Sequence, residues 1–477
     1  MIDLAVNLLR LGLGLGAVFF VGHGIQALAL PISGEWRKLE QAAMNFGLGT
    51  VALTLWMLAL TLAGIPFSLQ VTLVPPVALS GVILILKKRS EKGMVRRAHP
   101  AENRKPKTEN LVWDRIFLAL LALLLLFATL RATFYPMWAW DEIATWGCKA
   151  QVYFMSRSLD LTCIEAHNYY PNLVPFLLTY LYLCLGQVND HLAKAVFPLW
   201  GAMLLVILGF LLRRMGLTRT QTRGTVAFFA LNGTVFIVHL HLAYADLALA
   251  YFALGGAGLI YLWLQDKAPR GSLAVAAVMF AGMAWCKYEG PPLAGTVLLA
   301  AALTLLWLRP PGLGGRLLRL GIPGAGLASG YLPWKVYLIK NQIEAGSDHI
   351  MGFYPHQLLP SLGYLVDGLF NPFYFGILWP AAFLALVWAG RRLFNSASLF
   401  LALFLGGNLL AVILAYVVAP TGAAEFEMYV RATLDRLLLH LTPVAALAVG
   451  EGVKELGEGP GANKSPALFP NPHHNPL

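Results

Sequence analysis

The chain has 477 residues, of which 58% are hydrophobic and only 12% are charged. This composition, with a mean hydropathy of +0.65, lies far outside that of soluble domains and excludes an ordinary soluble enzyme. Apolar runs of the roughly 20 residues that a bilayer crossing requires recur along almost the whole length. We therefore expect an all-α, polytopic integral membrane protein. Its formal net charge of +11 then reflects membrane orientation and does not indicate nucleic-acid binding.

The first four apolar runs and the basic segment among them set the orientation. We expect helices over residues 4–30, 44–63, 69–86 and 113–135. The segment 87–107 contains nine Lys and Arg residues, so the positive-inside rule places it in the cytoplasm. The fourth helix then delivers residues 136–191 to the outer face as a large extracytoplasmic loop. Three N-terminal helices and the basic loop (1–110) thus precede the main transmembrane region (111–450).

The remaining crossings follow by alternation. Residues 171–186 are apolar but short, and if both they and 192–212 crossed, the arginines at 213, 214, 219 and 223 would lie outside. We therefore expect 171–186 to be an interfacial or re-entrant helix. Together with the first four runs, this gives about thirteen spanning helices: 192–212, 225–240, 247–264, 273–285, 293–308, 321–339, 373–390, 399–418 and 437–449. The polar tail 451–477 is expected to be disordered in the cytoplasm.

The stretch after the fourth helix places two adjacent carboxylates, Asp141 and Glu142, among three tryptophans. Trp138, Trp140 and Trp146 favour a position at the membrane interface, although their rings could equally stack on a sugar. Acids held at such a surface can do proton chemistry on a lipid. The same two acids would also suit the first turn of a surface helix.

Other polar side chains reach the outer face in the expected topology. They gather at five places along the chain: His167 to Tyr170; His239 with His241; Tyr244 with Asp246; Lys287 with Glu289; and Arg431 with Asp435 and Arg436. Ionisable residues at membrane depth are costly, so each is a functional hypothesis. Cations there could hold a lipid phosphate, and a carboxylate could take a proton from an attacking hydroxyl.

Each of these residues also has a purely structural interpretation. Lys287 and Glu289 could form an ion pair at a helix end, Arg436 could pair with Asp435 or with lipid headgroups, and Asp246 could cap a helix beginning at Leu247. His239 and His241 are two residues apart and do not share a helix face, so interface anchoring is favoured over a joint metal site. The common sidedness of the set is what favours a functional site.

The four cysteines have no CxxC or Cys/His spacing, so the sequence indicates neither a zinc site nor a disulfide framework. Cys148 and Cys163 could pair if their loop is extracytoplasmic.

In its acidic, basic and aromatic residues at the outer face, the chain resembles the glycosyltransferase C superfamily. Within that superfamily it resembles the bacterial members related to protein O-mannosyltransferases and lipid A aminoarabinose transferases. The resemblance covers roughly residues 113–449. The matching pieces are, in chain order, Asp141-Glu142, Tyr169-Tyr-Pro171, Tyr244-Ala-Asp246, Lys287-Tyr-Glu-Gly290, and Asp435-Arg436 with His440 and Pro443. The sequence shows no soluble module after Val449 that would recognise an acceptor.

The resemblance implies an inverting enzyme of the bacterial inner membrane with its active site on the extracytoplasmic side. It would transfer a sugar from a polyprenyl-phosphate-linked donor to a lipid, glycan or protein acceptor. Asp141 would be the catalytic base, with Glu142 and Asp246 shaping the site and Lys287 and Arg436 binding the donor phosphate. Tyr244, Glu289, His167 and Tyr170 complete the expected substrate-binding set. Some relatives use a divalent metal such as Mg²⁺ or Mn²⁺, and the sequence leaves this open.

Two other functions remain open at this stage. A transporter or flippase of lipid-linked saccharide would handle the same kind of lipid, but such proteins tend to show related halves with sites near the membrane midplane. We find no internal repeat, and the polar residues gather at one face. A polysaccharide polymerase or ligase would share the donor type.

Overall fold

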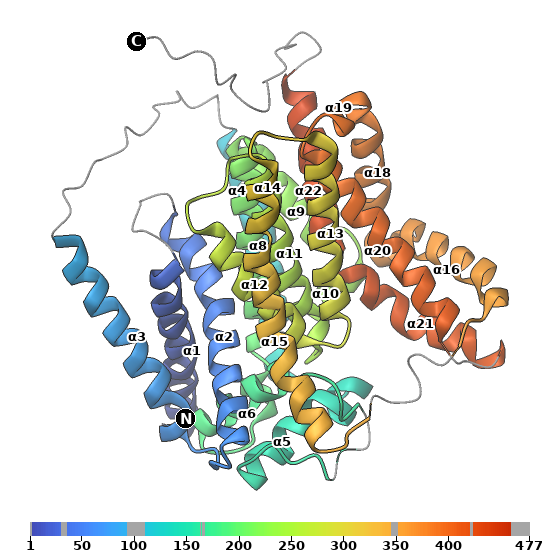
Figure 1. The fold of residues 1–477 in the computed structure, drawn as a ribbon. Helices are drawn as coiled ribbons and strands as arrows, with labels where there is room; N and C mark the ends of the chain where they lie inside the picture. The colour runs from blue at the N-terminus through green and yellow to red at the C-terminus, as the bar shows by residue number, and fades with distance from the viewer. Residues whose placement is uncertain are drawn as a thin grey trace.

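The structure is a computed structural model that describes residues 2–29, 36–92, 110–162, 164, 167–344, 352–419 and 423–458. These residues form helices and connecting turns, with no strand among the described ranges. The helices stand mostly side by side in one bundle (Figure 1). The expected all-α architecture is therefore confirmed.

The helices of the first half begin with α1 (Ile2–Ala29), α2 (Lys38–Leu62), α3 (Leu69–Lys92) and α4 (Leu111–Phe134). A π-helical turn, η1 (Glu142–Trp146), then leads into α5 (Gly147–Ser156) and α6 (Leu173–Leu185). The chain continues through α7 (Asp190–Ala193), α8 (Val196–Met215), α9 (Arg219–Leu231), α10 (Thr234–His239) and α11 (Ala245–Leu264).

The second half begins with α12 (Ser272–Cys286), α13 (Gly290–Leu308), α14 (Leu313–Arg319) and α15 (Gly321–Lys340). A short 3₁₀ turn, η2 (Pro355–Gln357), precedes α16 (Leu358–Phe370), α17 (Pro372–Phe375), α18 (Leu378–Ala389) and α19 (Arg391–Phe394). The last helices are α20 (Ser398–Val418), α21 (Ala423–Leu439) and α22 (Thr442–Glu458).

Eight of the described segments are long and apolar enough to cross a membrane: Asp3–Ala29, Lys38–Leu62, Leu69–Arg89, Leu111–Phe134, Asp190–Met215, Ala245–Leu264, Gly290–Leu308 and Ser398–Val418. A ninth is added if α21 and α22, bent by 49° relative to each other, form one broken span. Three further apolar helices, α6, α12 and α18, are shorter. The predicted number of thirteen is therefore not confirmed, although the polytopic architecture is.

Three predicted boundaries are wrong. The single helix expected over 225–240 is two helices, α9 and α10, separated at Asn232 and Gly233. Gly233 has φ of 106°, and a Cβ there would lie 2.2 Å from the carbonyl oxygen of Tyr374. The helix expected over 373–390 is divided in the same way, between α17 and α18, at Gly376 with φ of 56°. At the C-terminus, α22 continues to Glu458, so residues 451–458 are helical, and the rest of the predicted tail lies outside the described residues.

Helix α6, expected to be interfacial or re-entrant, is enclosed by protein. All thirteen of its residues are buried, and it is too short for the roughly 20 residues of a crossing. The hydroxyl of Tyr180 donates to the carbonyl oxygen of Gly14 at 2.9 Å, and Arg10 donates to the carbonyl oxygen of Leu185 at 3.0 Å. Helix α6 is thus covered by α1, in the region where α5 and α6 close one end of the bundle (Figure 1).

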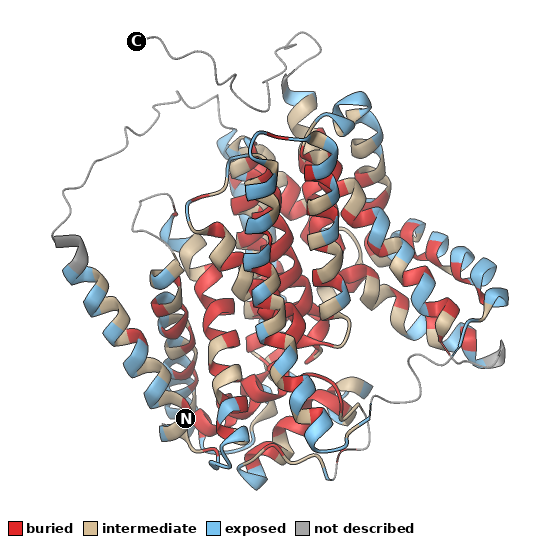
Figure 2. Cartoon of the chain, in the orientation of Figure 1, coloured by how far each residue is buried: buried red, intermediate tan, exposed pale blue. Residues whose placement is uncertain are grey.

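The centre of the bundle is α11, which is buried along almost its whole length (Figure 2). Its Tyr251 hydroxyl donates to the carbonyl oxygen of Ala43 and accepts from the backbone N–H of Gly47. On the neighbouring α12, the indole of Trp285 donates to the Thr54 hydroxyl at 3.1 Å. Helix α2 is therefore hydrogen-bonded to α11 and α12, the two helices that carry Asp246 and lead into Lys287.

Candidate functional site

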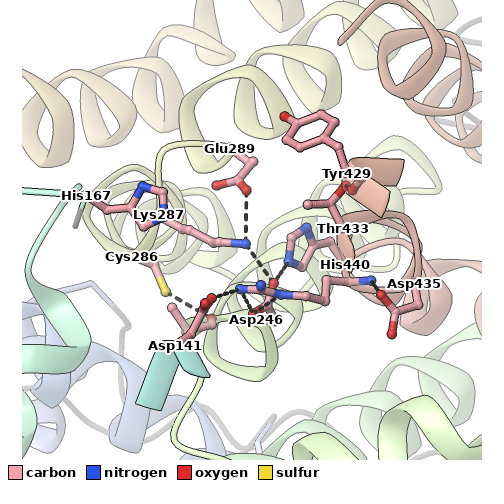
Figure 3. A network of polar contacts seen from close by, with 12 residues as sticks. Asp141, His167, Asp246, Cys286, Lys287, Glu289, Tyr429, Thr433, Asp435 and His440 are labelled. Carbon is pink, nitrogen blue, oxygen red and sulfur yellow. Dashed lines mark hydrogen bonds and ion pairs between the residues drawn. The ribbon is translucent and has the colours of Figure 1, made fainter. Parts of the chain in front are cut away.

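The polar residues converge where α11 begins, α12 ends and α21 meets α22 (Figure 3). Asp246 lies in the first turn of α11, after the N-cap residue Tyr244. Lys287 follows the last residue of α12. Arg436 lies in the last turn of α21, and His440 follows at the bend before α22. Three separate chain segments thus place polar and charged groups around one point.

Asp246 is the centre of this network and is fully buried. Its Oδ1 accepts from Lys287 Nζ at 2.8 Å and is 3.0 Å from His440 Nε2. Its Oδ2 accepts from Nε and Nη2 of Arg436, at 3.1 and 3.0 Å. Because both carboxylate oxygens face these three side chains, Asp246 does not act as the helix cap that the sequence also allowed.

Arg436 joins the network to the acidic pair of the first outer loop. Its Nη2 is 2.6 Å from Oδ2 of Asp141, and its guanidinium lies over the Tyr244 ring, 4.7 Å from the ring centre. Asp435 engages only the backbone here, accepting from the N–H of Arg436. Burial, followed by the nearby Asp141 carboxylate, raises the pKa of the Tyr244 phenol to about 12. Tyr244 therefore remains a neutral, aromatic support for the guanidinium.

Lys287 also pairs with Glu289, at 2.9 Å, as the simplest interpretation of the sequence predicted. Burial lowers the pKa of Lys287, but the carboxylates of Asp246 and Glu289 outweigh it and bring the pKa above its usual range. Burial raises the pKa of Glu289, and Lys287 outweighs this in turn, so the net pKa is lowered. Both groups are therefore charged near neutral pH. Asp141, Arg436, Asp246, Lys287 and Glu289 form one continuous chain of ion pairs.

Glu142 points away from this chain of ion pairs, into the protein. Its Oε2 accepts from the backbone N–H groups of Trp138 and Ala139, at 2.9 and 3.0 Å. Its Oε1 accepts from the N–H of Ala243 at 2.6 Å and lies 3.2 Å from Nζ of Lys194. The side chains of Glu142 and Lys194 are almost completely buried.

His167 and Tyr170 belong to a stack of aromatic rings that ends on Tyr288, the residue between Lys287 and Glu289. The two rings stack at 4.7 Å, and Tyr170 stacks in turn on Tyr288, with the ring planes 10° apart. The carbonyl oxygen of His167 accepts from the buried Lys149 at 2.6 Å. Burial lowers the pKa of Lys149 to about 7.

The other predicted outer residues lie outside the chain of ion pairs, and His239 adjoins it by packing edge-on against the Tyr244 ring, with 5.8 Å between the ring centres. His239 bonds through Nδ1 to the carbonyl oxygen of Val235 within its own helix, and His241 packs edge-on against Phe127. Arg431 pairs with Glu427 on the exposed side of α21. Trp138 and Trp140 are exposed, whereas Trp146 is fully buried. Cys163 is outside the described residues, so its pairing with Cys148 stays a prediction.

The divalent metal that the resemblance leaves open stays a prediction. No three His, Cys, Asp or Glu side chains within the described ranges are placed to hold one. Asp246, the most central carboxylate, is already held by Lys287 and Arg436.

The main residue that sequence reasoning missed is Lys194. It lies near the start of the apolar run 192–212, which the sequence predicts to be a membrane-spanning helix. A lone lysine in such a run is itself a functional signal, and it could have been used. Nothing in the sequence, however, indicates that its partner is Glu142.

Two crystal structures of ArnT from Cupriavidus metallidurans are similar to this chain, each with a TM-score of 0.51. The apo structure is 15% identical, and the similarity covers 73% of this chain and 62% of that one. The structure bound to undecaprenyl phosphate is 17% identical, with 72% and 60% covered. The chain shares the fold of these two structures over 73% and 72% of its length. It is an integral membrane protein that spans about three fifths of the length of these ArnT structures. No protein-family model matches the chain, and no curated protein matches it in sequence.

Proposed function

We propose that this chain is an inverting membrane glycosyltransferase that uses a polyprenyl-phosphate-linked sugar as donor. The acceptor would be a lipid, a glycan or a protein. The observation that carries the proposal is the chain of ion pairs from Asp141 to Glu289, in which two cations and three carboxylates meet at the ends of buried helices. A cluster of buried charges is expensive to maintain in a membrane protein, which supports a functional role for it.

The neighbouring fold supports the choice of donor. One of the two similar ArnT structures is bound to undecaprenyl phosphate, which is a polyprenyl phosphate. In this chain Lys287 and Arg436 are the cations that would hold such a phosphate. Lys287 offers a point charge, whereas Arg436 offers a planar fork that suits phosphate oxygens.

Asp141 is proposed as the general base. It would take the proton of the acceptor hydroxyl as the hydroxyl oxygen attacks the anomeric carbon of the donor. The bond between that carbon and the phosphate oxygen breaks in the same displacement, and polyprenyl phosphate leaves with the electron pair. A single displacement from the opposite face inverts the anomeric centre. The cations stabilise the negative charge on the leaving phosphate.

The charge distribution supports a site on the outer side of a bacterial plasma membrane. Arg219 and Arg223 pair with Asp114 in the first turn of α4. Asp141 follows the other end of the same helix. Arginines concentrate on the cytoplasmic side of membrane proteins, so the site would face outward.

The test is release of free polyprenyl phosphate from a panel of polyprenyl-phosphate sugars by the purified protein in detergent, with and without an acceptor extract. We expect release that requires both an acceptor and Asp141, so Asp141→Asn abolishes turnover while the protein stays folded. Full activity of Asp141→Asn would remove the base assignment. Lipid binding without release from any donor would favour a transporter of lipid-linked saccharide.

A further inference from the structure

We infer that Glu142 and Lys194 form a buried positioning pair that sets the distance between Asp141 and Asp246. The inference rests on the proposed function and gives Glu142 a role other than proton transfer. It also assigns a role to Lys194, which lies in a segment far from either acid in sequence. Neither side chain belongs to the chain of ion pairs that faces the substrate.

The carboxylate of Glu142 ties together two stretches of chain that lack regular helical hydrogen bonds. On one side it accepts from the N–H groups of Trp138 and Ala139, just before Asp141. On the other side it accepts from the N–H of Ala243, three residues before Asp246. One side chain therefore fixes the approach of both acids to Arg436.

Lys194 completes the pair by supplying the positive charge and by binding the end of α4. Its Nζ is 3.2 Å from Glu142 Oε1 and donates to the carbonyl oxygen of Pro136 at 3.0 Å. The exposed fractions of the Lys194 and Glu142 side chains are 1% and 0%. A carboxylate so deeply buried requires a counter-charge, and Lys194 provides it. Because both Glu142 oxygens and Lys194 are engaged in this way, the pair is built to hold backbone and not to meet a substrate.

Arg436 shows why the distance matters. Its Nη2 contacts both Asp141 and Asp246, while its guanidinium lies over Tyr244, the residue after Ala243. A small shift between the two chain stretches would separate Asp141 from this guanidinium. A displacement of about 1 Å in a catalytic constellation can lower the rate about 100-fold.

The test compares kcat, donor KM and the pH profile of kcat for Glu142→Gln and Lys194→Met. An amide has one acceptor oxygen, so Glu142→Gln turns an NH₂ group toward one of the backbone donors. Lys194→Met leaves the carboxylate buried without its counter-charge. We expect both to lower kcat about 100-fold with little change in donor KM. The acid limb of the pH profile should persist in both variants, because the proposed base, Asp141, is still present.

The matched control is Asp114→Asn, which removes the buried carboxylate that pairs with the partly exposed Arg219 and Arg223 at the opposite end of α4. It should lower thermal stability and leave kcat unaltered. If Lys194→Met behaves like this control, the pair is merely structural and the inference fails. If Glu142→Gln removes the acid limb while Lys194→Met turns over normally, Glu142 is itself the base and the inference is equally overturned.

Hydrogen exchange provides a readout that needs no turnover. The N–H groups of Trp138, Ala139 and Ala243 should exchange slowly in the wild-type protein, and all three should accelerate together in Lys194→Met. Fast exchange in the wild type overturns the inference even if no variant folds. A wild type that exchanges as expected but releases no polyprenyl phosphate from any donor would instead count against the proposed function alone.

Discussion

Replacing Arg436 with lysine is the most direct test of the ionic network, because it keeps the charge and changes only the geometry. Arg436 donates to Asp246 through Nε and Nη2, at 3.1 and 3.0 Å, and the same Nη2 lies 2.6 Å from Asp141. A lysine ammonium is a single point charge that cannot reproduce this fork above the Tyr244 ring. We expect it to reach one of the two acids and to lose the other.

The magnitude follows from the contact that is lost. A hydrogen bond to a charged group contributes about 1.5–3 kcal/mol, and Arg436 is only 16% exposed, so solvent weakens it little. With one factor of ten in rate for every 1.36 kcal/mol or so, kcat/KM should fall about 10- to 150-fold. The assay is the release of polyprenyl phosphate over a range of donor concentrations.

The control is Arg431→Lys on the same helix. Arg431 pairs with Glu427 where both side chains are more than half exposed, so its replacement should leave kcat/KM unchanged. If Arg436→Lys turned over the donor as fast as wild type, the bridging geometry would have no part in the reaction, and the reasoning from the fork would be refuted.

Two further predictions concern stability. The pKa of Lys149 is lowered to about 7, so between pH 7 and about 10 the folded protein holds fewer protons than the unfolded chain. The free energy of unfolding should therefore rise by up to about 1.4 kcal/mol per pH unit in this range. In measurements of Tm against pH, Lys149→Met should lack this rise, and parallel curves for the wild type and the variant would contradict the prediction. At Gly326, an added Cβ would lie 1.9 Å from the carbonyl oxygen of Ala277, whereas at Gly324 the nearest atom is 3.9 Å away. Gly326→Ala should thus lower Tm strongly and Gly324→Ala should not, and equal effects would show that the α12–α15 contact is not tight.

The long crossings could be predicted because the length of an apolar run is a local property of the sequence. Residues 247–264 and 399–418 were expected, and the helices run from Ala245 to Leu264 and from Ser398 to Val418. The breaks could not be predicted in this way. The helix breaks at Gly233, where the backbone of Tyr374 comes too close for a Cβ atom. Because Tyr374 is distant in sequence, a local pattern cannot reveal this contact.

The candidate site was predictable as a gathering of side chains and not as a set of contacts. Alternation of the helices placed Asp141, Asp246, Lys287 and Arg436 on one side, and the structure brings these four together. Their catalytic roles stay predictions. The inward direction of Glu142 could not be predicted, since two adjacent acids look equivalent in a sequence. Which of them faces the site depends on Lys194 and on three backbone N–H groups.

The hydrogen bonds of α11 and α12 to α2 determine the smallest piece of this chain that can stand alone. A protein shortened to start at the fourth helix would leave the Tyr251 hydroxyl and the Trp285 indole facing lipid without the backbone and Thr54 partners they now have. Hydrocarbon offers no replacement for those partners. The second helix is therefore an integral part of the folded unit, and an expression fragment for crystallography or cryo-electron microscopy should retain it.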